Sequence, residues 1–167
     1  FTGSHDKLEQ SYHPMVIKFF LLQAHYRSTI DFSNDSLKAA EKGLIRLFSA
    51  IQTLQNLVSK EKSTVDISGF KTKCRQAMND DFNTPIVLAH LFDAVKIINS
   101  TYENKFDLTE KDILELKDLF TNYTYNIFGL SEINKQDDNL VVDGVMEILL
   151  EIRNKSKEKK DWETADF

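Results

Sequence analysis

Two adjacent carboxylates in the stretch MNDDFNTP (78–85) are the first residues in this sequence that could do chemistry. Asp80 and Asp81 could hold a metal ion or share a proton. A calcium loop, however, places its acids at alternating positions with a glycine and a distant glutamate, and this stretch lacks that pattern. Adjacent helical residues also point about 100° apart, so the two carboxylates would not converge. We therefore expect Asp80, Asp81 and Asn83 to bond backbone donors at a joint between two helices, with Phe82 packed beneath it.

A group of cations towards the end of the sequence is the second candidate. Arg153, Lys157 and Lys160 have the four- and three-residue spacing that places side chains on one helix face, and Trp162 follows directly. A row of cations beside an aromatic ring suits a polyanion whose bases can stack. The alternative is an ordinary solvated helix end, where the helix dipole favours lysine in any case.

Arg27 is the third candidate, at the end of the first expected helix. Its guanidinium could grip a phosphate, or it could hold the following loop by pairing with Asp31 or with carbonyl groups. The residues alone leave both possibilities open.

Motifs for catalysis or for metal binding do not stand out in this sequence. The histidines have no HxxxH or CxxC partners, and Cys74 is the only cysteine, which excludes an internal disulfide and a thiolate zinc site. We expect Cys74 to be structural. The sequence has no P-loop, no GxGxxG and no nucleophile elbow, so we expect no catalytic residue, metal ligand or cofactor in this chain.

The composition indicates one ordinary domain with a real core, because 41% of the 167 residues are hydrophobic. The net charge of −5 does not by itself suggest nucleic-acid binding, but a whole-chain sum can hide a local basic face. No apolar run approaches the length of a membrane span. A single cysteine fits a reducing compartment, so we expect a cytoplasmic protein.

Helical periodicity dominates the whole chain, and no segment alternates with a period of two. Ser33 and the pair Thr109 and Asp112 have the spacing of helix N-caps, and Gly129 should end a helix. The pattern predicts an all-α antiparallel bundle with short connections, with helices over 14–26, 33–58, 67–79, 85–98, 109–127 and 141–152. Asp66 and Thr84 are the expected N-caps of the third and fourth helices. The apolar stripes expected to be buried include Leu21 in the first helix and, in the second, Leu37, Ala40, Leu44, Leu47, Ile51, Leu54 and Val58.

Three stretches together resemble the cysteinyl-tRNA synthetases. FFLLQAHYRSTIDFS (19–33) is similar to the helix and turn after the family's KMSKS loop, and AMNDDFNTPIVLAHLF (77–92) is similar to its helical-bundle signature. IRNKSKEKKDWETAD (152–166) resembles the stretch that leads into its anticodon-binding tip. The resemblance covers nearly the whole chain, and TIDFSNDSLKAAEKGL (29–44) resembles bacterial members.

The resemblance implies the C-terminal helical part of a class I synthetase, with a DALR-type fold. Residues 1–32 would connect to the catalytic domain, 33–160 would form the helical bundle, and 161–167 would begin the anticodon-binding tip. The catalytic domain, which would use ATP, Mg and Zn to join cysteine to tRNA(Cys), would lie upstream. This part would be non-catalytic and monomeric, and would hold the tRNA.

The resemblance also assigns roles to single residues. Trp162 would stack on an anticodon base, Asp166 would accept hydrogen bonds from a guanine edge, and Arg153 would lie on the same approach. Lys157 stands where the family often has arginine, which keeps the charge but loses the two-pronged fork. With Arg27 and Lys160 these are the predicted tRNA-binding residues. The alternative is a helical protein–protein interaction module that does not bind nucleic acid.

Overall fold

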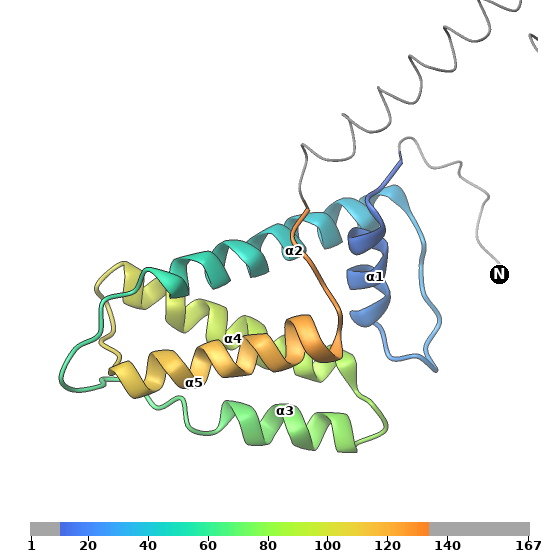
Figure 1. Cartoon of the computed structure of the whole chain (residues 1–167). Coiled ribbons are helices and arrows are strands. Elements are labelled where there is room, and N and C mark those ends of the chain that lie inside the picture. The colour runs from blue at the N-terminus through green and yellow to red at the C-terminus, as the bar shows by residue number, and fades with distance from the viewer. Residues whose placement is uncertain (1–10, 134–167) are drawn as a thin grey trace, which may run out of the picture. The chain divides into compact units, whose positions relative to one another are not determined.

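The computed structural model describes residues 11–133, and the helices in this range lie in one compact unit that ends at Glu132. Successive helices from α2 to α5 reverse direction, as Figure 1 shows. The described range contains no strand, so the prediction of an all-α antiparallel bundle is confirmed there. The elements are α1 (Pro14–Leu22), α2 (Asn34–Gln55), α3 (Phe70–Asn79), α4 (Thr84–Tyr102), α5 (Glu110–Phe120) and the π-helical η1 (Thr121–Ile127).

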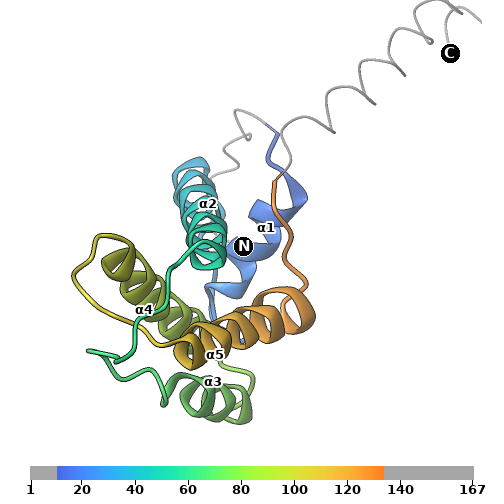
Figure 2. The ribbon, with the colours of Figure 1, turned by 60° about the vertical axis from the view of Figure 1, so that its left-hand side comes forward.

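Helix α4 packs against α1, α2 and α3, and α2 packs against α1, α4 and α5. Figure 2 shows α3 at one edge of the bundle and α1 beside α2. The apolar stripe predicted for α2 is buried as expected, over Leu37, Ala40, Leu44, Leu47, Ile51 and Leu54. In α4 the buried stripe includes Leu88, Leu91, Val95 and Ile98.

Helices α1 and α2 both end earlier than the periodicity predicts. Helix α1 stops at Leu22 instead of Tyr26, and Leu21, which we expected to be buried, is 49% exposed. Val16 and Phe19 fill the buried face instead, and the Phe19 ring packs edge-on against Phe92 of α4. Helix α2 ends at Gln55, so Val58 lies beyond it and is 77% exposed. Val58 keeps the spacing of the apolar stripe of α2, but it is not buried because the helix ends before it.

The helix caps agree only partly with the sequence. Ser33 caps α2, and Thr109 with Asp112 forms the predicted capping box of α5. Asp66 does not cap α3, because its carboxylate accepts hydrogen bonds from the N–H and hydroxyl of Ser68 in the turn before that helix. Helix α3 therefore begins at Phe70, without any side-chain cap.

Gly129 ends the last described helix, as predicted, with a left-handed φ of +57°. Its carbonyl accepts a hydrogen bond of 2.9 Å from Lys18 Nζ of α1. A Cβ at position 129 would lie 2.8 Å from the same Nζ. Glycine is required here both by the backbone conformation and by this close approach.

The joint between α3 and α4 contains two non-glycine residues with left-handed backbones, Asp81 (φ 54°) and Phe82 (φ 53°). The N–H of Phe82 bonds the Met78 carbonyl, and the N–H of Asn83 bonds the Ala77 carbonyl, which satisfies the end of α3. Phe82 is 67% exposed. The prediction that Phe82 packs beneath the joint is therefore wrong, because the conformation that closes the joint directs its side chain into solvent.

We predict that Phe82→Gly stabilises the protein. A left-handed backbone conformation costs an L-residue roughly 1–2 kcal/mol, and glycine removes this cost. The greater freedom of glycine in the unfolded chain offsets about 0.5–1 kcal/mol of the resulting stabilisation. The free energy of unfolding, measured by urea denaturation, should rise by about 0.5–1 kcal/mol. Phe82→Ala is the control, since it removes the exposed ring but keeps an L-residue, and it should change stability little. A Phe82→Gly protein less stable than Phe82→Ala would contradict the strain argument.

Candidate functional site

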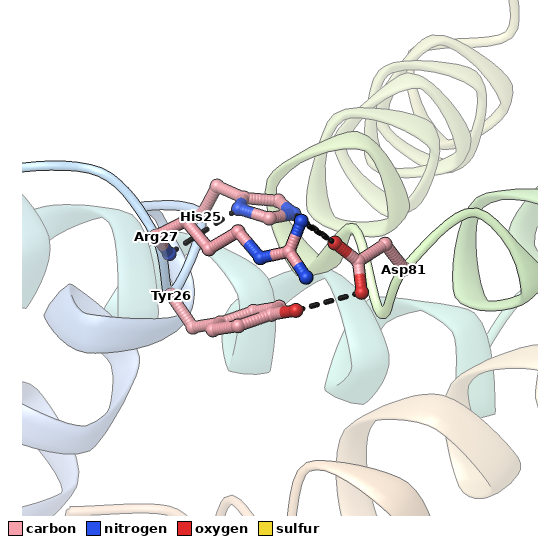
Figure 3. Close-up of polar contacts among 4 residues, drawn as sticks. All are labelled: His25, Tyr26, Arg27 and Asp81. Atoms are coloured by element: carbon pink, nitrogen blue, oxygen red, sulfur yellow. Dashed lines mark hydrogen bonds and ion pairs between the residues drawn. The ribbon is translucent and has the colours of Figure 1, made fainter.

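Three consecutive residues after α1 converge on one carboxylate in the α3–α4 joint (Figure 3). The Tyr26 hydroxyl donates a hydrogen bond of 2.7 Å to Asp81 Oδ1, and Arg27 Nη1 lies 3.1 Å from Asp81 Oδ2. His25 Nε2 is 3.9 Å from the same Oδ2. We call these four residues the Asp81 cluster.

Ring stacking and a cation–π contact hold the side chains of the Asp81 cluster together, in addition to its hydrogen bond and ion pair. The imidazole of His25 stacks on the Tyr26 ring with centroids 4.7 Å apart, and the Arg27 guanidinium lies 5.3 Å from the Tyr26 centroid. His25 Nδ1 accepts a hydrogen bond from the Arg27 backbone N–H. The hydrogen bond to Asp81 raises the pKa of Tyr26, with smaller raising effects from burial and from the Asp81 charge, while Arg27 lowers it. The neutral phenol is therefore the form that this arrangement favours.

A second bond ties the same two segments together. The hydroxyl of Thr84, the first residue of α4, donates to the Leu22 carbonyl at the end of α1 over 2.8 Å. Thr84 does not itself cap α4, since Asn83 occupies that position and its side chain makes no capping bond. The end of α1 is thus fastened to the α3–α4 joint at two points.

These contacts correct our expectation for the stretch MNDDFNTP. The Asp81 carboxylate bonds side chains from another segment, not backbone donors at its own joint. Arg27 likewise pairs with Asp81, which is neither of the partners expected within its own loop. Sequence reasoning missed this pairing because Arg27 and Asp81 are 54 positions apart in the sequence, and no local pattern connects them.

The Asp81 cluster can bind an anion through the guanidinium of Arg27. Its ion pair with Asp81 uses one guanidinium nitrogen, and its side chain is 70% exposed, so the remaining donors can reach a phosphate. The negative charge of Asp81 opposes that contact at the same time. The positive charge that the cluster presents to a phosphate is therefore partly neutralised.

The other predicted tRNA-binding residues, Arg153, Lys157, Lys160, Trp162 and Asp166, lie outside the described residues. Within residues 11–133 no group of three or more His, Cys, Asp or Glu side chains is arranged to hold a metal ion. None of the helices in that range combines the length and the apolar character that a membrane crossing requires.

Cys74 is buried in α3, as expected of a structural cysteine. Burial raises the pKa of its thiol to about 11. The thiol is therefore protonated at neutral pH and is a poor nucleophile.

Comparison with known proteins identifies the helices around this joint. Residues 73–134 match the model of the DALR domain family. Over the whole chain the sequence is 48% identical to the cysteine–tRNA ligase of Bacteroides fragilis, and over 99% of the chain it is 48% identical to that of Parabacteroides distasonis. A more distant relative, the cysteine–tRNA ligase of Chlorobium chlorochromatii, is 35% identical over 96% of the chain.

The described bundle is accordingly a helical domain of the DALR class. The chain belongs to the cysteine–tRNA ligase family and corresponds to the C-terminal part of its members. It spans about a third of the length of the curated relatives it matches, 34% in each of the three named here. The predicted family, its bacterial character and the DALR-type fold are confirmed.

We predict that Asp81→Asn lowers the pKa of Tyr26. The raised pKa reflects a folded state that favours the neutral phenol, so this contribution to stability is present below the ordinary tyrosine pKa and is lost as the pH rises through the folded value. Without the carboxylate charge, Tyr26 should titrate closer to an ordinary tyrosine. The titration is followed by ultraviolet difference absorbance against a Tyr26→Phe protein, which removes the signals of the other tyrosines.

Asp80→Asn is the matched control, because it removes an equal charge from the adjacent residue. It should shift the Tyr26 titration much less than Asp81→Asn does. Equal shifts for the two variants would show that the general negative charge of the joint acts on Tyr26, and that the hydrogen bond to Asp81 does not.

Proposed function

We propose that this chain is the tRNA-holding part of a cysteine–tRNA ligase. It would position tRNA(Cys) for ATP-dependent cysteinylation by a catalytic part that the chain does not contain. The observation that carries the proposal is the alignment of the entire chain, at 48% identity, with a protein named cysteine–tRNA ligase. The match of residues 73–134 to the DALR domain supports the same conclusion.

The proposed contacts follow from the chemistry of the predicted residues. Arg153, Lys157 and Lys160 would pair with phosphates, Trp162 would stack on a base, and Asp166 would accept hydrogen bonds from a guanine edge. Phosphate contacts would supply most of the affinity and would make binding strongly dependent on salt.

Arg27 is the one predicted residue within the described part of the chain. Its exposed guanidinium suits an auxiliary phosphate contact, weaker than that of an unpaired arginine because Asp81 already neutralises part of its charge.

The remaining features of the proposal concern the whole ligase. We propose a monomeric cytoplasmic enzyme that uses ATP, Mg and Zn through residues of the catalytic part. The helical part would contribute rigidity, because its core joins α1, α2, α3 and α4 into one packed unit. A rigid support keeps a bound tRNA at a fixed distance from a remote active site.

Changing Lys157, Lys159 and Lys160 together to Ala should weaken binding to a tRNA(Cys) transcript and reduce its dependence on salt. Each lost phosphate contact lowers the slope of log K against log salt by about one. The measurement is fluorescence anisotropy across a series of salt concentrations. The control changes Lys60, Lys62 and Lys105 to Ala, which removes the same charge elsewhere.

Two results of this titration would count against the proposal. Equal affinities and slopes for the two triple variants would remove the cation row from the mechanism. Failure of the unmodified chain to bind tRNA, together with salt-tolerant binding to a protein, would favour the alternative of a protein–protein interaction module.

A second expectation is that the chain alone does not activate cysteine. ATP–pyrophosphate exchange dependent on cysteine should stay at background, because we place the residues for that chemistry in the catalytic part. A full-length family member serves as the positive control. Exchange by the 167-residue chain above background would require a catalytic site within it.

A further inference from the structure

Helix α1 is joined to the rest of the bundle by hydrogen bonds at two separate places. In its middle, Lys18 Nζ donates a hydrogen bond of 2.9 Å to the carbonyl of Gly129, just after η1. At its end, the Leu22 carbonyl accepts a hydrogen bond of 2.8 Å from the hydroxyl of Thr84, at the start of α4. We call these two hydrogen bonds the α1 ties. Because they reach different elements, they hold α1 against pivoting as well as against sliding.

Neither of the α1 ties serves the helix that supplies its donor. Thr84 begins α4, but its hydroxyl bonds α1, and the N-cap residue Asn83 makes no side-chain bond, so α4 begins without a side-chain cap. Lys18 lies within α1, but its ammonium bonds a carbonyl 111 positions away in the sequence. Both donors therefore act between segments and not within one.

The residue at position 129 is restricted by the same contact. Gly129 has a left-handed φ of +57°, and a Cβ there would lie 2.8 Å from Lys18 Nζ. The ammonium thus occupies the space that a side chain at position 129 would need. The contact between α1 and the end of η1 depends on both residue types, lysine and glycine.

The apolar contacts of α1 supply its burial, and the ties supply direction. Helix α1 packs more extensively on α2, its neighbour in the sequence, than on α4, where the Phe19 ring meets Phe92. Hydrophobic burial is non-directional, whereas a hydrogen bond weakens steeply as it departs from a linear geometry. The angle at which α1 leaves the bundle should therefore be more sensitive to the ties than its burial is.

Helix α1 also holds a particular position in the order of the chain. The chain covers 34% of the length of the relatives named above and corresponds to their C-terminal part. Of the described helices, α1 comes first. The catalytic part of the ligase would thus be joined to the bundle through α1, and a change in the angle of this helix would displace one part relative to the other.

We propose that Lys18 and Thr84 are positioning residues of the ligase, which fix the catalytic part relative to the bundle through the α1 ties. This inference rests on the proposed function. Neither side chain touches a substrate in this proposal. A displacement of about 1 Å can slow a reaction about a hundredfold, so the transfer of cysteine to a tRNA held by the bundle should depend on the ties. Reactions of cysteine and ATP alone should not.

The test compares Thr84→Val with Thr84→Ser in the full-length ligase that carries this chain. Valine keeps the branched shape of threonine and lacks the hydroxyl, whereas serine keeps the hydroxyl. The measurement is the single-turnover rate of cysteine transfer to tRNA(Cys), with enzyme in excess so that all tRNA is bound. This rate should fall about fivefold in Thr84→Val, because one lost hydrogen bond shifts an equilibrium by about that factor. In Thr84→Ser it should stay near the rate of the parent ligase.

Lys18→Met is the second variant, and it tests the other tie. Methionine keeps an unbranched apolar stem and removes the ammonium from an exposed position, so folding is not at risk. The transfer rate should fall as in Thr84→Val. Lys96→Met is the matched control, because it removes an equal charge and a hydrogen bond of 2.8 Å to Asp93, within α4. It should leave the rate unchanged.

Two further measurements separate positioning from a general loss of structure or of binding. Cysteine-dependent ATP–pyrophosphate exchange and the Kd for tRNA(Cys) should both be unchanged in Thr84→Val and Lys18→Met. If exchange falls together with transfer, or if affinity falls as much as transfer does, the ties serve folding or binding and the proposal is wrong.

The outcomes also separate this inference from the proposed function. If the parent ligase cysteinylates tRNA(Cys) and both variants transfer cysteine at the parent rate, the positioning role is excluded while the proposed function stands. If the parent ligase does not cysteinylate tRNA(Cys), both fail. Selective slowing of transfer in both variants, with the parent rate kept in Thr84→Ser, supports the positioning role.

Discussion

The reversal of the chain between α3 and α4 is the constraint on which the rest of the described structure depends. Only four residues, 80–83, separate the two helices, which must lie antiparallel to bury their facing apolar side chains. The last carbonyls of α3 need hydrogen-bond donors, and Pro85 in the first turn of α4 has no backbone N–H to donate. The N–H groups of Phe82 and Asn83 turn back to supply them, which requires left-handed backbone at Asp81 and Phe82.

The same reversal places Asp81 where it can reach the end of α1. One carboxylate there accepts from Tyr26 and pairs with Arg27, while Thr84 bonds the Leu22 carbonyl. Exposed ion pairs stabilise proteins by only about 0–1 kcal/mol. The consequence of this cluster is therefore mainly geometric, because it sets the direction in which the chain leaves α1. Burial of Phe19 against Phe92 supplies the apolar part of the same contact.

The sequence predicted those features that depend on neighbouring residues. The buried stripe of α2, the capping box at Thr109 and the stop at Gly129 each follow from spacing within one segment. Val58 was misplaced because periodicity does not show where a helix ends. Leu21 was misplaced although it lies within α1, because periodicity does not show which side of a helix faces the core.

The features that depend on distant contacts were not predictable from the sequence. Asp81 and Arg27 pair only because the fold brings α1 to the joint, and exposure of Phe82 follows from a backbone conformation that phenylalanine rarely adopts. The candidate site within the described residues thus had one predicted member, Arg27, whose actual partner no local signal could have indicated.

The proposed contact of this bundle with tRNA depends on local charge and not on net charge. A lysine at a helix C-terminus has an adequate explanation in the helix dipole, whereas Lys71 and Lys73 stand near the opposite end of α3, where the dipole opposes them. The charge of Lys71 is offset by Asp118, and the charge of Arg27 is offset by Asp81. Arg75 has no such counter-charge within the described residues, so a phosphate approaching α3 would meet less competition there than at Arg27.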